Sequence, residues 1–282
     1  MDSATASLLI VATLGALVIA YVLGRPMLRA RRRRRRATMP FPAHWEAVLR
    51  TGLPLYPYLP DGVRERLHGV VHNLLAEKTF VGCAGLEVTD NMRLAIAAQA
   101  ALLQLKPDAG LYPTVHSILV YPEQFFVEHE TRDEAGVHSH QRRLLSGESW
   151  EQGKIVVSWN DVLESVRDPG DGYNVVLHEF AHALDHEDGA ANGLPPLPAD
   201  MDARRWQQVM SDAYARLCQR VEHDGEPLID PYGTESPAEF FAVVTETFFE
   251  LPAALAEEEP QLYRELVHYY GVDPAGWRAG MA

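Results

Sequence analysis

Cysteine is nearly absent from this chain of 282 residues, in which only Cys83 and Cys218 occur. A fold held together by disulfides needs several cysteines, so the sequence excludes a small disulfide-stabilised scaffold and favours a reducing compartment. Basic residues are also scarce outside one N-terminal block. Residues 37–282 hold 17 of the 25 basic residues against 38 of the 39 acidic ones, a net charge of about −21. This acidic body lacks the basic surface of a nucleic-acid-binding protein, and no nucleic-acid partner is expected.

Charged residues are missing altogether from residues 6–24, a run rich in Leu, Val, Ile and Ala. At ~1.5 Å per residue such a helix reaches ~28 Å, close to the hydrocarbon thickness of a bilayer. Only Asp2 precedes the run and eight arginines follow it, the reverse of the charge order in a cleaved signal peptide. The sequence predicts an N-terminal tail (1–5), a transmembrane helix (6–24) and an Arg-rich juxtamembrane linker (25–39). By the positive-inside rule, this is a single-pass inner-membrane protein whose body faces the cytoplasm.

The remaining chain, with 40–276 as one domain and 277–282 as a C-terminal tail, is expected to fold as α+β. Helical spacing of apolar residues predicts helices over 43–50, 61–78 and 91–105, the last one capped by Thr89 or Asp90. Runs of β-branched and aromatic residues predict strands at 117–121, around 125–127 and at 154–159, with Glu151-Gln152-Gly153 as a hairpin turn. The predicted domain is mainly helical and contains a small sheet.

One motif carries most of the chemistry: His178-Glu179-Phe180-Ala181-His182 reads H-E-x-x-H. Residues four apart lie on one face of a helix, so both histidines can bind one metal ion while the adjacent Glu179 acts as a general base. Apolar residues surround the motif, and Gly189 can end the segment. The alternative is that the two histidines lie at the surface or in the core and bind no metal. The motif in this setting favours a catalytic zinc site, with one Zn²⁺ per chain.

A catalytic zinc site needs a third protein ligand and an open position. Asp185 and Asp188 stand where the H-E-x-x-H-x-x-G-x-x-H pattern requires Gly and His, which argues against that class. His186 continues the histidine row, but helix geometry rotates it by about 80° from His178. The remaining candidates are carboxylates further along the chain.

A later helix begins at Ser236-Pro237-Ala238-Glu239. Ser236 as cap, with Glu239 three residues later, is a capping box, so Glu239 is either the third ligand or the partner of the cap. Glu246 lies on the same helix face and is the next candidate, as a ligand or as a group that orients a ligand histidine. Asp230 and Glu235 are weaker candidates, because they precede the helix.

Five other histidines are expected to have no metal role. His68 and His72 share the four-residue spacing but lack the adjacent glutamate, which favours an ordinary half-buried helix face. A polar, acidic segment predicted to be a solvated loop contains His129, His138 and His140.

The strand Ile155–Trp159 is a candidate edge strand beside the metal helix, where it would pair with an extended substrate.

Several short motifs occur in one order along the chain: Ala84–Thr89, Ile96–Ala100, Val120–Pro122, Gly147–Trp150, Asn174–Asp185, Tyr232 and Ser236–Val243. In these motifs the chain resembles the MtfA (Mlc titration factor A) family of zinc metallopeptidases across roughly residues 40 to 276. The resemblance implies a gluzincin-like, zincin-type catalytic core related in arrangement to anthrax lethal factor. It also implies aminopeptidase-like activity on short peptides.

The same resemblance implies roles for individual residues. His178, His182 and Glu239 are the expected zinc ligands, Glu179 the general base, and Tyr232 the residue that supports the developing oxyanion. It further implies an association with the transcriptional repressor Mlc and with control of sugar uptake. Family members are typically soluble, whereas this chain is predicted to begin with a membrane span. The expected function is a membrane-anchored zinc peptidase; the alternative is a binding protein that sequesters a cytoplasmic repressor with the same fold.

Overall fold

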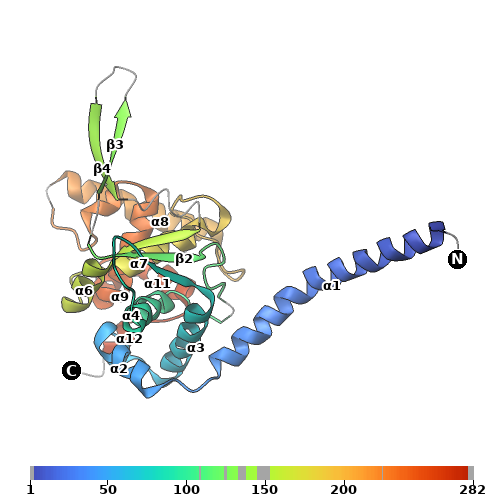
Figure 1. Ribbon diagram of the computed structural model, residues 1–282. Coiled ribbons are helices and arrows are strands. Elements are labelled where there is room, and N and C mark those ends of the chain that lie inside the picture. The colour runs from blue at the N-terminus through green and yellow to red at the C-terminus, as the bar shows by residue number, and fades with distance from the viewer. Residues whose placement is uncertain are drawn as a thin grey trace. The chain divides into compact units, whose positions relative to one another are not determined.

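The computed structural model describes residues 3–107, 109–123, 126–132, 138–144, 153–223 and 225–278. The chain forms two compact units, residues 1–40 and 41–282. The first unit is a single helix, α1 (Ser3–Ala37), drawn in blue in Figure 1. The arginine block therefore continues the helix that begins in the apolar run, as expected from the good helix propensity of arginine.

Part of α1, Ala12–Ala37, is long and apolar enough to cross a membrane. It is the one such helix in the described part of the chain, and N-terminal signal sequences meet the same criterion. The side chains of Leu14, Leu17 and Ile19 are exposed, which leaves an apolar surface on this unit.

The second unit begins with α2 (Ala43–Gly52), α3 (Asp61–Glu77) and α4 (Asp90–Leu102), so the three predicted helices are confirmed. Thr89 caps α4, because its Oγ1 accepts a hydrogen bond from the Met92 amide at 3.3 Å. On α3, the ring of His68 stacks on Phe41 at 3.8 Å and its Nε2 lies 2.8 Å from the Tyr56 hydroxyl. His68 is thus a packing residue, as the sequence indicated.

The sheet is parallel. Its strands are β1 (Thr79–Gly82), β2 (Ser117–Tyr121) and β5 (Lys154–Ser158), in the order β1-β2-β5. The prediction of a hairpin leading into β5 was wrong about the pairing, since β5 pairs in parallel with β2 and places Ile155 beside Ile118. Glu151 and Gln152 of the predicted turn lie outside the described residues. The strand also ends one residue early, because the Ser158 hydroxyl accepts the Asp161 amide at 3.3 Å and so caps a new helix.

A separate antiparallel pair is formed by β3 (Phe126–Arg132) and β4 (His138–Leu144), which project from the unit in Figure 1. The predicted solvated loop was therefore wrong: His129, His138 and His140 belong to these two strands. Both strands are rich in polar residues. The alternation of polar and apolar residues that reveals a half-buried strand is consequently missing from their sequence.

The rest of the unit is helical. It consists of α6 (Trp159–Arg167), α7 (Val175–Asp185), α8 (Ala203–Glu222), α9 (Pro237–Glu250), α10 (Pro252–Glu258), α11 (Pro260–Tyr270) and α12 (Ala275–Arg278), with short 3₁₀ turns η1 (Tyr56–Tyr58), η2 (His186–Asp188) and η3 (Pro231–Thr234). The prediction of a mainly helical chain with a small sheet is confirmed.

Helices α7 and α9 pack against each other in the core. Twelve of the fourteen residues of α9 are buried, Phe241 and Phe248 completely. On α7, Phe180 is 1% exposed and its ring meets that of Tyr112 at 4.7 Å. Burying each such aromatic side chain stabilises the fold by about 1.5–3 kcal/mol. The apolar core around α7 and α9 therefore holds the two helices together.

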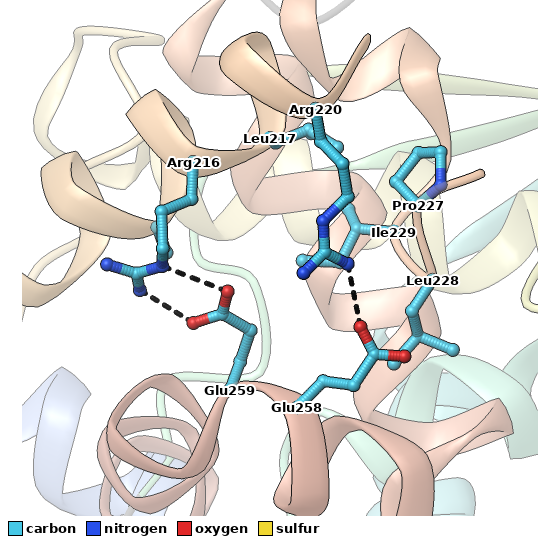
Figure 2. Close-up of a pocket in the computed structure, with 9 residues that line it drawn as sticks. Arg216, Leu217, Arg220, Pro227, Leu228, Ile229, Glu258 and Glu259 are labelled. Carbon is cyan, nitrogen blue, oxygen red and sulfur yellow. Dashed lines mark hydrogen bonds and ion pairs between the residues drawn. The ribbon is translucent and has the colours of Figure 1, made fainter. Parts of the chain in front are cut away.

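Residues of α8, of the segment after it and of the junction between α10 and α11 line a pocket, shown in Figure 2. Two ion pairs cross it: Arg216 holds both carboxylate oxygens of Glu259 at 3.0 and 2.6 Å, and Arg220 contacts Glu258 at 2.7 Å. The arginines are nearly half exposed, and exposed pairs contribute about 0–1 kcal/mol each. These pairs connect α8 to the junction of α10 and α11.

Candidate metal centre

Asn174, the residue that precedes helix α7, makes hydrogen bonds with both α7 and α9. The Asn174 side chain caps the helix by accepting the Leu177 amide at 3.1 Å. Its own amide donates to Oε2 of Glu246, and its Nδ2 donates to Glu250 at 3.2 Å. Both carboxylates belong to α9, so the start of α7 is fixed relative to α9.

Three side chains from these two helices converge. His178 and His182 bring their Nε2 atoms within 3.1 Å of each other. Oε2 of Glu239 lies 3.1 Å from the first of these nitrogens and 3.2 Å from the second. Among the described residues, these three form the one group with the geometry of a metal site.

The dimensions of this triangle fit zinc. A tetrahedral zinc ion with bonds of about 2.0–2.1 Å holds its ligand atoms about 3.3 Å apart. Two ring nitrogens and one carboxylate oxygen are also donors that zinc prefers. The lone pairs of two imidazole nitrogens repel each other at this distance. The arrangement beside a carboxylate is favourable when a cation, or a proton on one ring, lies between the two nitrogens.

The electrostatics of the triangle favour positive charge. Burial alone would lower the pKa of His178, but hydrogen bonds to Glu239 and Glu246 raise it well above its ordinary value. Burial likewise opposes ionisation of Glu239, yet the two histidines lower the pKa of this carboxyl to about 2. The site thus holds a carboxylate beside a proton, which a metal cation can displace from His178.

Glu246 lies on the other side of the His178 ring. Its Oε1 is 2.8 Å from Nδ1, whereas the metal triangle uses Nε2. The sequence left open whether Glu246 is a ligand or an orienting group; in the structure its carboxylate contacts the ring nitrogen of His178 that is not part of the triangle. It is 2% exposed, and burial raises the pKa of its carboxyl, which hydrogen bonding to His178 partly offsets.

Glu179 follows His178 directly and is 7% exposed. Its negative charge contributes to the raised pKa of His178, so the two groups interact electrostatically. A buried carboxylate is a residue type that can act as a general base.

Tyr232 lies in η3, and its ring is close to that of His178. Its ring centre is 6.0 Å from that of His178, and its side chain is 50% exposed. The turn is shaped locally, since Oδ1 of Asp230 accepts the Tyr232 amide at 2.8 Å. The aromatic ring is therefore next to a metal-facing histidine and open to a ligand arriving from solvent.

The weaker candidates lie outside the triangle. Asp188 is exposed and accepts the Ala190 amide at 3.1 Å, and His186 caps the end of α7. Asp185 is fully buried but binds the Gly193 amide at 2.7 Å. Asp230 and Glu235 are both exposed and lie at the two ends of η3, before α9.

Sequence reasoning missed two groups that hold the site. Glu250 accepts the Gly170 amide at 3.0 Å as well as the Asn174 side chain, and the Ser165 hydroxyl accepts the Val175 amide at 3.3 Å. Glu250 stands four residues after Glu246 in a helix of otherwise apolar character. A second buried acid at that spacing is a signal that the sequence does contain.

Comparison with other proteins agrees with this geometry. The family model of the glucose-regulated metallo-peptidase M90 matches residues 28–271. An uncharacterized protein of Synechocystis sp. is 40% identical over 258 residues, which cover 91% of this chain and 94% of that protein. Mlc titration factor A of Pectobacterium atrosepticum and that of Serratia proteamaculans are each 36% identical, over 82% of this chain and 86% and 88% of theirs. The chain therefore belongs to the M90 metallopeptidases, the family of the Mlc titration factors A.

Proposed function

We propose that this protein is a zinc-dependent peptidase that hydrolyses short peptides in an aminopeptidase-like manner. One observation carries the proposal: Nε2 of His178, Nε2 of His182 and Oε2 of Glu239 converge at 3.1–3.2 Å in a chain of a metallopeptidase family. In this proposal these three atoms bind one Zn²⁺ and Glu179 is the general base.

A bound zinc ion supplies Lewis acidity, which lowers the pKa of water and polarises a peptide carbonyl. Glu179 takes the proton from the attacking water and later returns it to the leaving amine. Glu246 keeps the His178 ring oriented through Nδ1. The Tyr232 hydroxyl donates a hydrogen bond to the oxyanion that forms on the substrate carbonyl.

The sheet supports a peptide as substrate. In the described part of the chain β5 pairs with β2 along one side and lies at the end of the strand order. It also contacts α7, which carries both histidines. In this proposal an extended peptide pairs by backbone hydrogen bonds with the edge of β5 that faces away from β2 and so reaches the metal centre.

The decisive experiment is Glu179→Gln, because glutamine keeps the shape of the side chain but cannot accept the proton. The variant is expected to bind one zinc ion per chain and to lose peptide hydrolysis by several orders of magnitude. Exposed Glu235 provides the matched control, Glu235→Gln, which is expected to keep both. Near-parental turnover in Glu179→Gln would refute the peptidase assignment.

The proposal includes membrane attachment through α1, in the inner membrane with the catalytic unit in the cytoplasm. The apolar run of this helix and the eight arginines at its C-terminal end support this orientation. Anionic lipid headgroups would attract the arginines on the cytoplasmic side.

A second function is suggested by the relatives named Mlc titration factor A. In this alternative the protein sequesters a transcriptional repressor similar to Mlc, and the metal site stabilises the binding fold. Glu179→Gln separates the two functions. If the inactive variant still relieves repression by the bound repressor, the result supports sequestration. If relief of repression is lost together with hydrolysis, the result supports the peptidase.

A further inference from the structure

The segment after α7 returns to the first turn of α9, where Gly193 makes an unusually close approach. A Cβ atom added to Gly193 would lie 2.2 Å from the carbonyl oxygen of Pro237 and 2.6 Å from its carbonyl carbon. The residue also has a φ of +76°, which disfavours any side chain. Only glycine therefore fits between this segment and Pro237.

Asp185, the last residue of α7, holds Gly193 in this place. Its Oδ2 accepts the Gly193 amide at 2.7 Å, and its side chain is 0% exposed. Burial raises the pKa of this carboxyl to about 6, and the hydrogen bond from the Gly193 amide opposes this shift. A buried carboxylate thus holds the Gly193 amide against the start of α9.

Pro237 is the first residue of α9, and Glu239 follows two positions later. The Ser236 hydroxyl accepts the Glu239 amide at 3.2 Å, so both residues belong to one rigid capped turn. Any displacement of the Pro237 carbonyl is consequently passed on to Glu239. A metal site tolerates only about 0.5 Å of such displacement.

We propose that the Asp185–Gly193–Pro237 contact positions Glu239 against His178 and His182, and so sets the geometry of the metal centre. This inference rests on the proposed zinc site. Glu246 and Glu250 fix α9 to the start of α7, and the Asp185–Gly193–Pro237 contact fixes the first turn of α9 to the end of α7. Asp185 and Gly193 are positioning residues, since neither faces the metal triangle.

Gly193→Ala tests the contact, with Gly189→Ala as matched control. Both glycines have positive φ, +76° and +96°, so both substitutions introduce backbone strain. Gly189, however, has no atom within 4 Å of an added Cβ. Zinc affinity, measured against a competing chelator, is expected to fall about 10-fold or more in Gly193→Ala relative to Gly189→Ala. The visible absorption spectrum of the Co²⁺-substituted protein is expected to change only in Gly193→Ala.

Asp185→Asn is the second variant and covers the case in which Gly193→Ala does not fold. Its control is Asp188→Asn, an exposed aspartate three residues later. Asp185→Asn is expected to weaken zinc binding and alter the Co²⁺ spectrum, whereas Asp188→Asn keeps both. Parental affinity and spectrum in Asp185→Asn and in a folded Gly193→Ala would overturn the inference while leaving the zinc site intact. A parent protein that binds no zinc would overturn the proposed function and this inference together.

Discussion

Nδ1 of His178 lies 2.8 Å from Oε1 of Glu246, while Nε2 of the same ring faces Glu239 at 3.1 Å. The carboxylate of Glu246 selects the tautomer with the hydrogen on Nδ1, which leaves the Nε2 lone pair for a metal ion. The other oxygen of Glu246 accepts the Asn174 amide at the start of α7. One buried side chain therefore orients the ring and fixes the helix that carries it.

Glu246→Gln is expected to weaken zinc affinity by roughly 10- to 100-fold, because the amide is a poorer partner for the ring. Glu250→Gln is the control, since Glu250 contacts the same segment without touching His178. It should lower the thermal midpoint of unfolding but weaken zinc binding less than Glu246→Gln does. Equal zinc affinities in the two variants would contradict the orienting role of Glu246.

Glu239→Ala separates a metal ligand from a helix-cap partner. The Ser236 hydroxyl accepts the backbone amide of residue 239, which alanine retains, so the cap survives the substitution. We expect a loss of zinc affinity by orders of magnitude, measured by chelator competition. Ser236→Ala, the control, should cost about 1 kcal/mol of stability and keep the metal. The ligand role fails if Glu239→Ala behaves like Ser236→Ala.

Tyr232→Phe is expected to reduce kcat by about 10²–10³-fold with little change in KM or zinc content, because one oxyanion donor is lost. The half-exposed side chain has little packing to lose. Tyr58→Phe, at a partly exposed tyrosine in η1, serves as the control and should keep kcat. A rise in KM alone would instead indicate that Tyr232 binds substrate without assisting the chemistry.

Glu187 in η2 predicts a pH effect on stability. Burial raises the pKa of its carboxyl from 4.5 to about 7, with Lys78 opposing the shift. The folded state therefore holds this proton more tightly than the unfolded state, and its ionisation lowers stability progressively as pH rises from about 4.5 to about 7. For the metal-free protein, Glu187→Gln should raise the unfolding midpoint at about pH 8 and leave it unchanged near pH 4. Asp188→Asn controls for the change of charge, and equal effects of the two substitutions would rule out burial as the cause.

Removal of residues 1–40 tests the anchor. The shortened protein is expected to be soluble and to retain zinc and hydrolysis, because the second unit is compact by itself. The full chain should sediment with membranes and resist extraction by alkaline carbonate. On sealed inner-membrane vesicles of known orientation, protease added from the cytoplasmic side should digest the catalytic unit. Digestion only from the other side would reverse the predicted topology.

The sequence predicted the part of the site that depends on local geometry. His178 and His182 lie on one face because a helix repeats every 3.6 residues, and Gly189 follows the 3₁₀ turn that ends the segment. Glu239 is different, since it lies 57 residues after His182. Its approach to the histidines depends on how α9 packs, and local sequence explained the same glutamate equally well as a cap partner.

Other errors have related causes. A strand pattern identifies a strand but not its partner, so the parallel pairing of β5 with β2 was missed. β1, only four residues long, gave too short a pattern to recognise. The contact of Gly193 with Pro237 depends on a close backbone approach that residue types alone do not reveal.

The separation of the ligands along the chain also determines when the site can form. Synthesis proceeds from the N-terminus, so both histidines are made well before Glu239 and Glu246. A nascent chain that ends before α9 has two ring nitrogens and neither carboxylate. Because metal affinity depends on the complete, folded ligand set, tight zinc uptake has to wait for the C-terminal helices. For the proposed zinc peptidase, chains interrupted before α9 are therefore expected to remain metal-poor and without hydrolytic activity.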